Sequence, residues 1–365
     1  MTRVAYYIDS HGFGHSTRSI CLASHFPKDW NLVIKTNGPR WLFQEELLID
    51  FEFQPSELDV HPIQSEGYRI NIDATGEFLL EKLNRSEQLI ENEMDWLRDQ
   101  KIDLVLSDIS PLAIESAHRC GIPCYGISNF TWHWIMEPFF TDGPQSQAIR
   151  SLEEMMGRAT ANFRLPFSVP EVYPGPSIET PLLTRLPRKP RERTRREFGM
   201  GTDLPYVLIT FGGLDRPDRD LRVLEKFSPI QFVRTLSSSE RRMRSADQFF
   251  ERDREIENLW HYVHPELYHP DLVGVVDAVI TKPGYGILSE TMALGTPLLL
   301  DTRDDFREFD VVKEVLDKYP QVQFLPSDRM ERLDFEKELN EILSVERKVW
   351  EGPANGAEFI LERIQ

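Results

Sequence analysis

Short apolar runs alternate with helical patterns along the first half of this 365-residue chain. Runs rich in β-branched and aromatic residues lie at 3–9, 31–36, 102–108 and 122–128, and each is short enough to be a buried parallel strand. Apolar residues spaced three and four apart predict helices between them, at 76–101 and 111–121. Strand, crossover helix and strand repeated in this order predict a doubly wound parallel α/β sheet.

The same alternation restarts in the second half, with strands predicted at 206–213, 229–236, 277–284, 296–302 and 322–326. Between the halves lies a proline-dense stretch without a sustained period, which predicts an extended linker. A chain of this length also exceeds what one hydrophobic core usually serves. We therefore expect two Rossmann-like domains facing each other across a cleft, at 1–163 and 191–346, joined by a linker at 164–190. Residues 347–365 are expected to end in a helix that packs back on the N-terminal domain.

The charge balance argues against a nucleic-acid-binding protein. The formal net charge is −18, whereas a dedicated nucleic-acid-binding protein needs a basic face to neutralise phosphates. The three cysteines, Cys21, Cys120 and Cys124, fit a reducing compartment and lack the spacing of a zinc site. No apolar stretch is long enough to span a bilayer and the N-terminus lacks a signal-peptide pattern, so we expect a cytoplasmic protein.

The first predicted strand runs into a glycine turn, "HGFGHSTRS" at 11–19. As a dinucleotide fingerprint it has Thr17 where a third glycine or alanine belongs. The second strand ends in Lys35, Thr36 and Asn37 rather than in the acidic residue that binds a ribose. These two departures disfavour a nicotinamide-dinucleotide site.

His15 follows this turn at the start of the next helix, at the carboxyl edge of the sheet, and Asp108 ends a later strand at the same edge. A histidine oriented by a carboxylate is the minimal unit of a general base. The alternatives are that Gly12 and Gly14 merely permit a tight turn and that Asp108 caps its next helix.

A second glycine turn follows the predicted strand at 277–284, in "DAVITKPGYGILSETMALGTPLLL". Backbone N–H groups at Gly284 and Gly286, backed by a helix N-terminus, suit a diphosphate. Glu290, one turn into the helix, suits ribose hydroxyls, and Lys282 precedes the turn. The glycine pair 212–213 ends the first strand of the same domain. The alternative is that Glu290 and Lys282 are ordinary solvated side chains.

The segment "TKPGYGILSETMALGTPLLL" resembles the donor-binding segment of glycosyltransferases with the glycosyltransferase-B fold. The "GFGH" loop and "LVLSDISPLAIESAHRCGIP" resemble the segments that carry the family's histidine and its aspartate partner. Over almost the whole chain, "YY" before "HGFGHSTR", "FRLP", "YHPDLVGVVDAVITKPGYG" and "RDDFREF" resemble the glycosyltransferase-like module of plant L-arabinokinases and its bacterial stand-alone relatives.

This resemblance implies roles for particular residues. The C-terminal domain would bind a nucleotide-diphosphate sugar, most often a uridine one, as a co-substrate, with no cofactor. The residues expected at the nucleotide and diphosphate are Gly212, Gly213, His264, Lys282, Gly284, Tyr285, Gly286, Ser289 and Glu290. Those expected at the donor sugar are Asp304, Asp305 and Glu308. His15 would be the base with Asp108 behind it, and the acceptor side would hold His11, Gly12, Gly14, Asn129 and Trp132.

The predicted function is inverting, metal-independent glycosyl transfer to an acceptor hydroxyl of a small molecule or glycan. Two departures leave the donor open: Pro283 and Tyr285 flank the turn glycine, and the longer signature of plant natural-product transferases is absent. The alternatives are a nucleotide-sugar-binding module without turnover, or a sugar epimerase or phosphorylase on the same fold. The acidic run "DTRDD" at 301–305 lacks a clean D-x-D, so we assign it to sugar hydroxyls or solvent and expect no metal.

Overall fold

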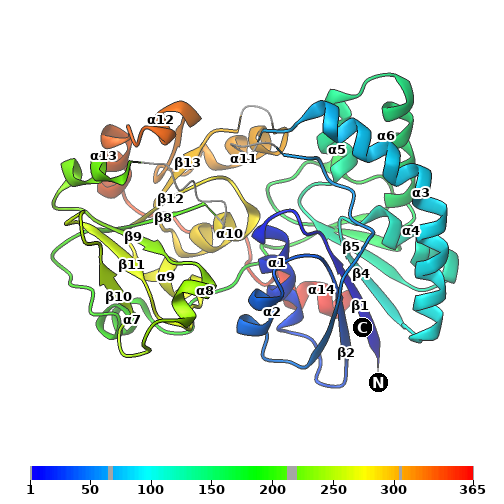
Figure 1. Cartoon of the computed structure of the whole chain (residues 1–365), viewed down its shortest axis with the longest axis horizontal. Coiled ribbons are helices and arrows are strands. Elements are labelled where there is room, and N and C mark those ends of the chain that lie inside the picture. Colours follow the sequence, from blue (N-terminus) through cyan, green and yellow to red (C-terminus); the bar gives the residue numbers. More distant parts are fainter. Residues whose placement is uncertain (1, 65–68, 212–219, 304–305, 365) are drawn as a thin grey trace. The chain divides into compact units, whose positions relative to one another are not determined.

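The computed structural model describes residues 2–64, 69–211, 220–303 and 306–364 (Figure 1). The chain divides into two compact units. The first comprises Met1–Leu183, Asp305–Val312 and Asn355–Gln365, and the second comprises Thr184–Asp304 and Lys313–Ala354. None of the helices in these described ranges combines the length and the apolar character that a membrane-crossing segment needs.

A parallel sheet in the order β3-β2-β1-β4-β5-β6-β7 forms the centre of the first unit. Its strands are β1 (Arg3–Ile8), β2 (Asn31–Lys35), β3 (Phe51–Gln54), β4 (Leu104–Asp108), β5 (Cys124–Ser128), β6 (Ala161–Arg164) and β7 (Ser177–Glu179). Its helices are α1 (Phe13–Ala23), α2 (Arg40–Glu46), α3 (Ile72–Asp99), α4 (Pro111–Cys120), α5 (Trp132–Met136), η2 (Glu137–Phe139), α6 (Gly143–Met156), η3 (Pro170–Val172) and α14 (Gly356–Ile364). Figure 1 shows α3, α4 and α6 together on one face and α1, α2 and α14 on the other.

The second unit repeats this plan in the order β10-β11-β9-β8-β12-β13-β14. Its strands are β8 (Tyr206–Thr210), β9 (Gln231–Thr235), β10 (Phe250–Arg252), β11 (Leu259–Tyr262), β12 (Ala278–Thr281), β13 (Leu298–Asp301) and β14 (Val322–Leu325). Its helices are α7 (Arg191–Glu197), η4 (Leu221–Phe227), α8 (Ser238–Arg242), α9 (His269–Val275), α10 (Tyr285–Leu294), α12 (Ser327–Glu331) and α13 (Glu336–Ser344), with α11 (Glu308–Leu316) running from residues of the first unit into the second. Neighbouring strands are parallel except β10 and β11.

Burial on both faces explains why the strands of the second sheet read as continuous apolar runs. Val207 and Ile209 of β8 pack into one apolar cluster, whereas Leu208 between them packs into a second. Successive side chains of a strand point to opposite faces, so helices must cover this sheet on both sides. The expectation of two doubly wound α/β domains is confirmed, with the antiparallel β10–β11 pair as an addition at one edge.

The stretch expected to be a linker, 164–190, is more structured than its prolines indicate. It begins within β6 and contains β7, the edge strand of the first sheet. An edge strand tolerates neighbouring prolines because one side of its backbone needs no ladder partner. The first segment of the first unit ends at Leu183, so only the part of the stretch after Leu183 joins the two units.

The C-terminal helix α14 belongs to the first unit, where it packs beside α1 (Figure 1). The backbone N–H of Gly356 donates to the carbonyl of Leu182 at 3.1 Å, so α14 begins directly against the chain that leaves β7. This contact leaves no room for a side chain at the first residue of the helix.

Replacing Gly356 with alanine is therefore expected to destabilise the first unit. A Cβ there would lie 2.7 Å from the carbonyl oxygen of Pro181 and 2.9 Å from the Cα of Leu183, and neither backbone atom can turn aside. We expect the free energy of unfolding, from urea titration, to fall by about 1–3 kcal/mol. The control is Gly201→Ala, where nothing lies within 4 Å of the added carbon. Equal stability of the two variants would contradict this packing.

Candidate functional site

His15 lies at the carboxyl edge of the first sheet because the turn after β1 leads directly into α1. Gly12 precedes the helix with a φ of 82°, a left-handed conformation that favours glycine. Ile8, the last residue of β1, pairs in register with Asp108, the last residue of β4. The structure therefore brings the two predicted residues together: Nδ1 of His15 lies 2.8 Å from Oδ1 of Asp108, and both side chains are buried.

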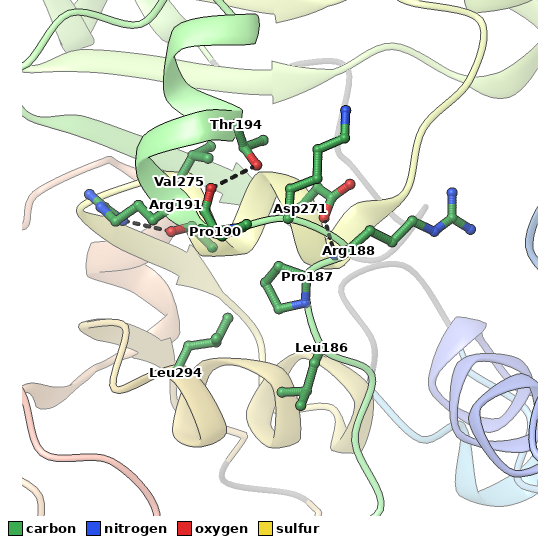
Figure 2. A pocket seen from close by; sticks show the side chains of 11 residues that line it. Leu186, Pro187, Arg188, Pro190, Arg191, Thr194, Asp271, Val275 and Leu294 are labelled. Carbon is green, nitrogen blue, oxygen red and sulfur yellow. Dashed lines mark hydrogen bonds between the residues drawn. The ribbon is translucent and has the colours of Figure 1, made fainter.

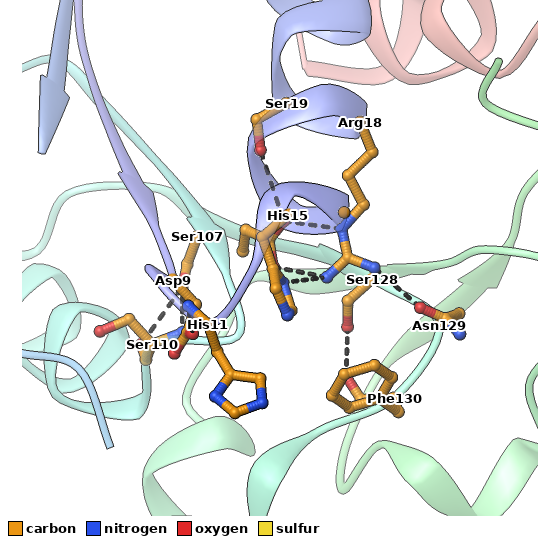
Figure 3. Close-up of polar contacts among 12 residues, drawn as sticks. Asp9, His11, His15, Arg18, Ser19, Ser107, Ser110, Ser128, Asn129 and Phe130 are labelled. Carbon is orange, nitrogen blue, oxygen red and sulfur yellow. Dashed lines mark hydrogen bonds and ion pairs between the residues drawn. The ribbon is translucent and has the colours of Figure 1, made fainter. Parts of the chain in front are cut away.

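Arg18 completes this arrangement from one turn further along α1 (Figure 3). Its Nε donates to Oδ2 of Asp108 at 2.6 Å and its Nη2 donates to Oδ1 at 2.5 Å. The same Nη2 lies 2.8 Å from Nδ1 of His15. Arg18 was not among the residues predicted from the sequence, although its place three residues after His15 puts both on one helix face.

The charges of Arg18 and Asp108 stabilise each other in this buried position. Burial by itself raises the pKa of Asp108, but the charges and hydrogen bonds of Arg18 and His15 outweigh burial and leave that pKa below its ordinary value. Burial likewise opposes the charge of Arg18, but Asp108 outweighs it and raises the pKa of the guanidinium. Asp108 is therefore an ionised carboxylate, which can accept a hydrogen bond from Nδ1 of His15 when that nitrogen carries a proton.

The polar network continues to Asn129, which is also buried. Its Oδ1 accepts from Nη1 of Arg18 at 2.7 Å (Figure 3), and its Nδ2 donates to Oε1 of Glu308 at 2.6 Å. Glu308 was expected at the donor sugar, yet it is grouped with the first unit and connects through Asn129 to the histidine–aspartate pair. His15, Asp108, Arg18, Asn129 and Glu308 thus form a single network of five hydrogen-bonded side chains.

The other residues expected on the acceptor side surround the turn before α1. Gly14 lies inside α1, and its carbonyl accepts from the hydroxyl of Thr17 at 3.1 Å. The His11 ring lies edge-on to Trp132, with 4.9 Å between ring centroids. Trp132 is only 1% exposed and its indole nitrogen donates to Oδ2 of Asp9 at 2.8 Å. Its ring packs in the apolar core of the first unit.

Asp9, Asp59 and His61 form a group whose ligand atoms lie close enough to hold a metal ion, the one such group within the described ranges. Burial and the charge of Asp9 raise the pKa of Asp59 to about 7. Burial also opposes the charge of Asp9, but hydrogen bonding and charge from His61 outweigh it and lower the pKa of Asp9. Asp59 accepts from the Ser10 hydroxyl at 2.6 Å and Asp9 from the backbone N–H of His11 at 2.8 Å.

In the second unit, the turn after β12 leads into α10 at Gly284. The N-cap residue Gly284 has no side chain, and among the described residues nothing lies within 4 Å of where its Cβ would stand. The first backbone N–H groups of a helix have no partner within it and carry its positive dipole end. Tyr285 and Gly286 are buried at this end, and the Ser289 hydroxyl donates to the carbonyl of Gly286 at 2.9 Å. The arrangement is a helix N-terminus suited to an anion.

Glu290 is held more tightly than the sequence indicates. Its carboxylate is 1% exposed, and Oε1 accepts from Nε of Arg185 at 2.8 Å and from Nη2 of the same side chain. Oε2 faces Nδ1 of His269 at 3.3 Å. Burial opposes its charge, but Arg185 and His269 outweigh burial and lower the pKa of Glu290. Glu290 is neither solvated nor unpartnered, and the sequence analysis named neither partner.

The remaining expected donor residues are less informative. The carbonyl of His264 accepts from Nη1 of the buried Arg241 at 3.4 Å, and its ring stacks on Phe249. Lys282 is half-buried before the turn. The other four residues expected at the donor, Gly212, Gly213, Asp304 and Asp305, lie outside the described residues.

A pocket of about 430 Å³ lies elsewhere in the second unit, lined by the chain before α7 and by α9 (Figure 2). Leu294, at the far end of α10 from Gly284, also lines it. Its basic side chains are engaged: Arg191 donates to the carbonyls of Gly274 and Val276, and Arg188 stacks on Tyr268. Because the pocket touches the C-terminal end of α10, at Leu294, it is distinct from the N-terminus of that helix.

Two known proteins are similar to this chain in sequence. No family model matches the sequence. The chain is 25% identical over 323 residues to the L-arabinokinase of Arabidopsis thaliana, covering 86% of this chain and 30% of that protein. It is 27% identical over 222 residues to an uncharacterized glycosyltransferase of Methanopyrus kandleri, covering 58% of this chain and 59% of that protein. The chain thus spans less than two thirds of either relative.

Solved structures of glycosyltransferases share the fold. The glycotransferase of kitacinnamycin superposes with a TM-score of 0.64 at 14% identity, over 94% of this chain and 91% of that chain. Arabidopsis thaliana UGT89C1, solved with UDP, superposes with a TM-score of 0.59 at 13% identity, over 100% of this chain and 99% of that chain. VinC, solved with dTDP, superposes with a TM-score of 0.57 at 14% identity, over 99% and 94% of the two chains. The glycosyltransferase-B fold implied by the sequence resemblance is confirmed.

His133 lies on α5 and is expected to make the first unit sensitive to acid. Burial and the nearby charge of Arg307 lower the pKa of His133 from 6.5 to about 4. A histidine with a lowered pKa stabilises the fold above its unfolded pKa, and that contribution is lost as the pH falls from 6.5 towards 4. We expect His133→Gln to lose about 2 kcal/mol less unfolding free energy than the parent between pH 7.5 and pH 5. Parallel losses in urea titrations of the two proteins would contradict this assignment.

Proposed function

We propose that this chain is an inverting, metal-independent glycosyltransferase. It would move a sugar from a UDP-linked nucleotide sugar to an acceptor hydroxyl. The observation that carries the proposal is the buried pair of His15 and Asp108 at the carboxyl edge of the first sheet, 2.8 Å apart. The glycosyltransferase-B fold, and the UDP and dTDP in solved neighbours, support the donor class. The three cysteines are free, which fits the reducing cytoplasm.

The proposed reaction is a single displacement. Nδ1–H of His15 donates to Asp108, which leaves the lone pair of Nε2 to take the acceptor hydroxyl proton. The acceptor oxygen forms a bond to the anomeric carbon, and the bond from that carbon to the diphosphate oxygen breaks. The electron pair leaves with the diphosphate, and the configuration at the anomeric carbon inverts. Asp108 stabilises the imidazolium that forms.

The second unit would bind the nucleotide diphosphate. The N-terminus of α10 would offer backbone N–H groups and the positive end of a helix dipole to the departing charge, so the proposed chemistry does not require a metal ion. Glu290 would accept from the ribose hydroxyls through Oε2, while Arg185 fixes Oε1. In this proposal Arg185 positions the carboxylate, and Lys282 adds positive charge beside the turn.

A valine at Gly284 tests the diphosphate site. The backbone there is extended, with φ −155° and ψ 136°, and among the described residues nothing lies within 4 Å of an added Cβ, so we expect the fold to persist. The measurement is calorimetric titration with UDP, dTDP, GDP and ADP, with and without magnesium. We expect the parent protein to bind one of these nucleotides without metal. We expect Gly284→Val to bind the same nucleotide at least about tenfold more weakly. Gly201→Val, also in open space, is the control. Unchanged affinity, or binding of none of the four, would contradict the donor site.

An asparagine at His15 tests the base. Its amide still donates to Asp108 but takes no proton, so we expect nucleotide binding to persist and release of nucleoside diphosphate to fall about 10²–10⁴-fold. His25→Asn, an exposed histidine beyond the C-terminal end of α1, is the control. Full activity of His15→Asn would contradict the assignment. Nucleotide sugar that is bound but never turned over would indicate a binding module, and an intact nucleotide with an altered sugar would indicate an epimerase.

A further inference from the structure

The ring nitrogen Nδ1 of His15 has two neighbours, one a hydrogen-bond acceptor and the other a hydrogen-bond donor. Oδ1 of Asp108 lies 2.8 Å away and can only accept, whereas Nη2 of Arg18 lies 2.8 Å away and can only donate. If Nδ1 carries the proton, Nε2 is free to act as a base. If Arg18 donates to Nδ1, the proton sits on Nε2 and His15 takes no proton from an acceptor.

We propose that Arg18 is a positioning residue that keeps His15 neutral with its proton on Nδ1. The proposal rests on the proposed function and concerns the regulation of its base. Arg18 does this through Asp108: it fixes the carboxylate with two hydrogen bonds, and its charge opposes the effect of that carboxylate on the ring.

The carboxylate favours the tautomer with the proton on Nδ1, because Oδ1 of Asp108 can only accept from that nitrogen. Nη2 of Arg18 carries two hydrogens, and its contact with Oδ1, at 2.5 Å, is shorter than its contact with Nδ1 of His15, at 2.8 Å. An oxygen has two lone pairs, so Oδ1 accepts from both Nη2 and Nδ1. Nε and Nη1 of Arg18 are engaged by Oδ2 of Asp108 and by Asn129, which fixes the guanidinium plane. A planar fork suits this geometry better than the point charge of a lysine.

The charges around the ring decide how readily it gains a second proton. Asp108 from β4 favours the imidazolium, whereas Arg18 from α1 disfavours it at nearly the same distance. The N-terminus of α1, where His15 is the third residue, also disfavours it. Other facing groups are Asp9, His11, Glu308 beyond Asn129, and the rings of Phe130 and Trp132. Arg18 is therefore the nearest charge that opposes protonation of the ring.

The test uses ¹⁵N-histidine NMR of the full chain without donor or acceptor, with the His15 signals identified by their loss in His15→Asn. For the parent protein we expect the tautomer with the proton on Nδ1 at neutral pH. For Arg18→Met we expect the His15 titration midpoint to rise by about one pH unit or more, because the carboxylate is then unopposed. We expect Arg18→Lys to restore most of this midpoint.

A second variant of opposite sign guards against misfolding of Arg18→Met. In Asp108→Asn the charge of Arg18 is unopposed, so we expect the His15 midpoint to fall. The acid limb of the pH–rate profile of nucleotide release should move with the NMR midpoint in each variant that turns over. A merely structural role for Arg18 would lower activity at every pH without moving either midpoint.

Three results would overturn the proposal: a proton on Nε2 in the parent, an unmoved midpoint in a folded Arg18→Met, or an unmoved midpoint in a folded Asp108→Asn. The NMR readout needs no turnover. Sugar transfer with unmoved midpoints would therefore reject the role of Arg18 alone, and shifted midpoints without any transfer would reject the proposed function alone.

Discussion

Two buried charges meet at the carboxyl end of β4, the guanidinium of Arg18 and the carboxylate of Asp108, each no more than 2% exposed. Removing water from two ions is costly, and their attraction offsets that cost only when their hydrogen bonds are well formed. Here they are: two bonds join the pair, and Asn129 takes a third from the guanidinium. Through these bonds the pair fixes α1, the end of β4 and the chain after β5 against one another.

A similar arrangement recurs in the second unit. Glu290 is buried like Asp108, an arginine engages it through Nε and Nη2, and a histidine faces it through Nδ1. Asp108 ends β4 at the carboxyl edge of the first sheet, where α/β folds place ligands, whereas Glu290 lies in α10, the helix that follows β12. In both units the arginine explains how the carboxylate remains charged when buried.

Much of this was predictable from the sequence, because strand burial and glycine turns are local signals. The strands that flank both turns were located from apolar runs, and His15 and Asp108 could be paired because the carboxyl ends of parallel strands share an edge. The edge strands β3 and β7 were missed, because their partly exposed residues give no continuous apolar pattern. Arg185 was missed because its partner Glu290 lies 105 residues away, and no periodicity reports such a contact. The sequence left open whether Trp132 contacts an acceptor or fills a core, because burial is a tertiary property that its residue type does not reveal; the structure shows it buried.

The most direct test of single displacement by His15 needs no knowledge of the acceptor. Water can replace the acceptor hydroxyl, and the first-formed anomer of the released sugar can be read by proton NMR before mutarotation equilibrates it. From an α-linked nucleotide sugar that the protein binds, the account predicts that the β anomer appears first. First appearance of the α anomer would contradict a single displacement and the role assigned to His15.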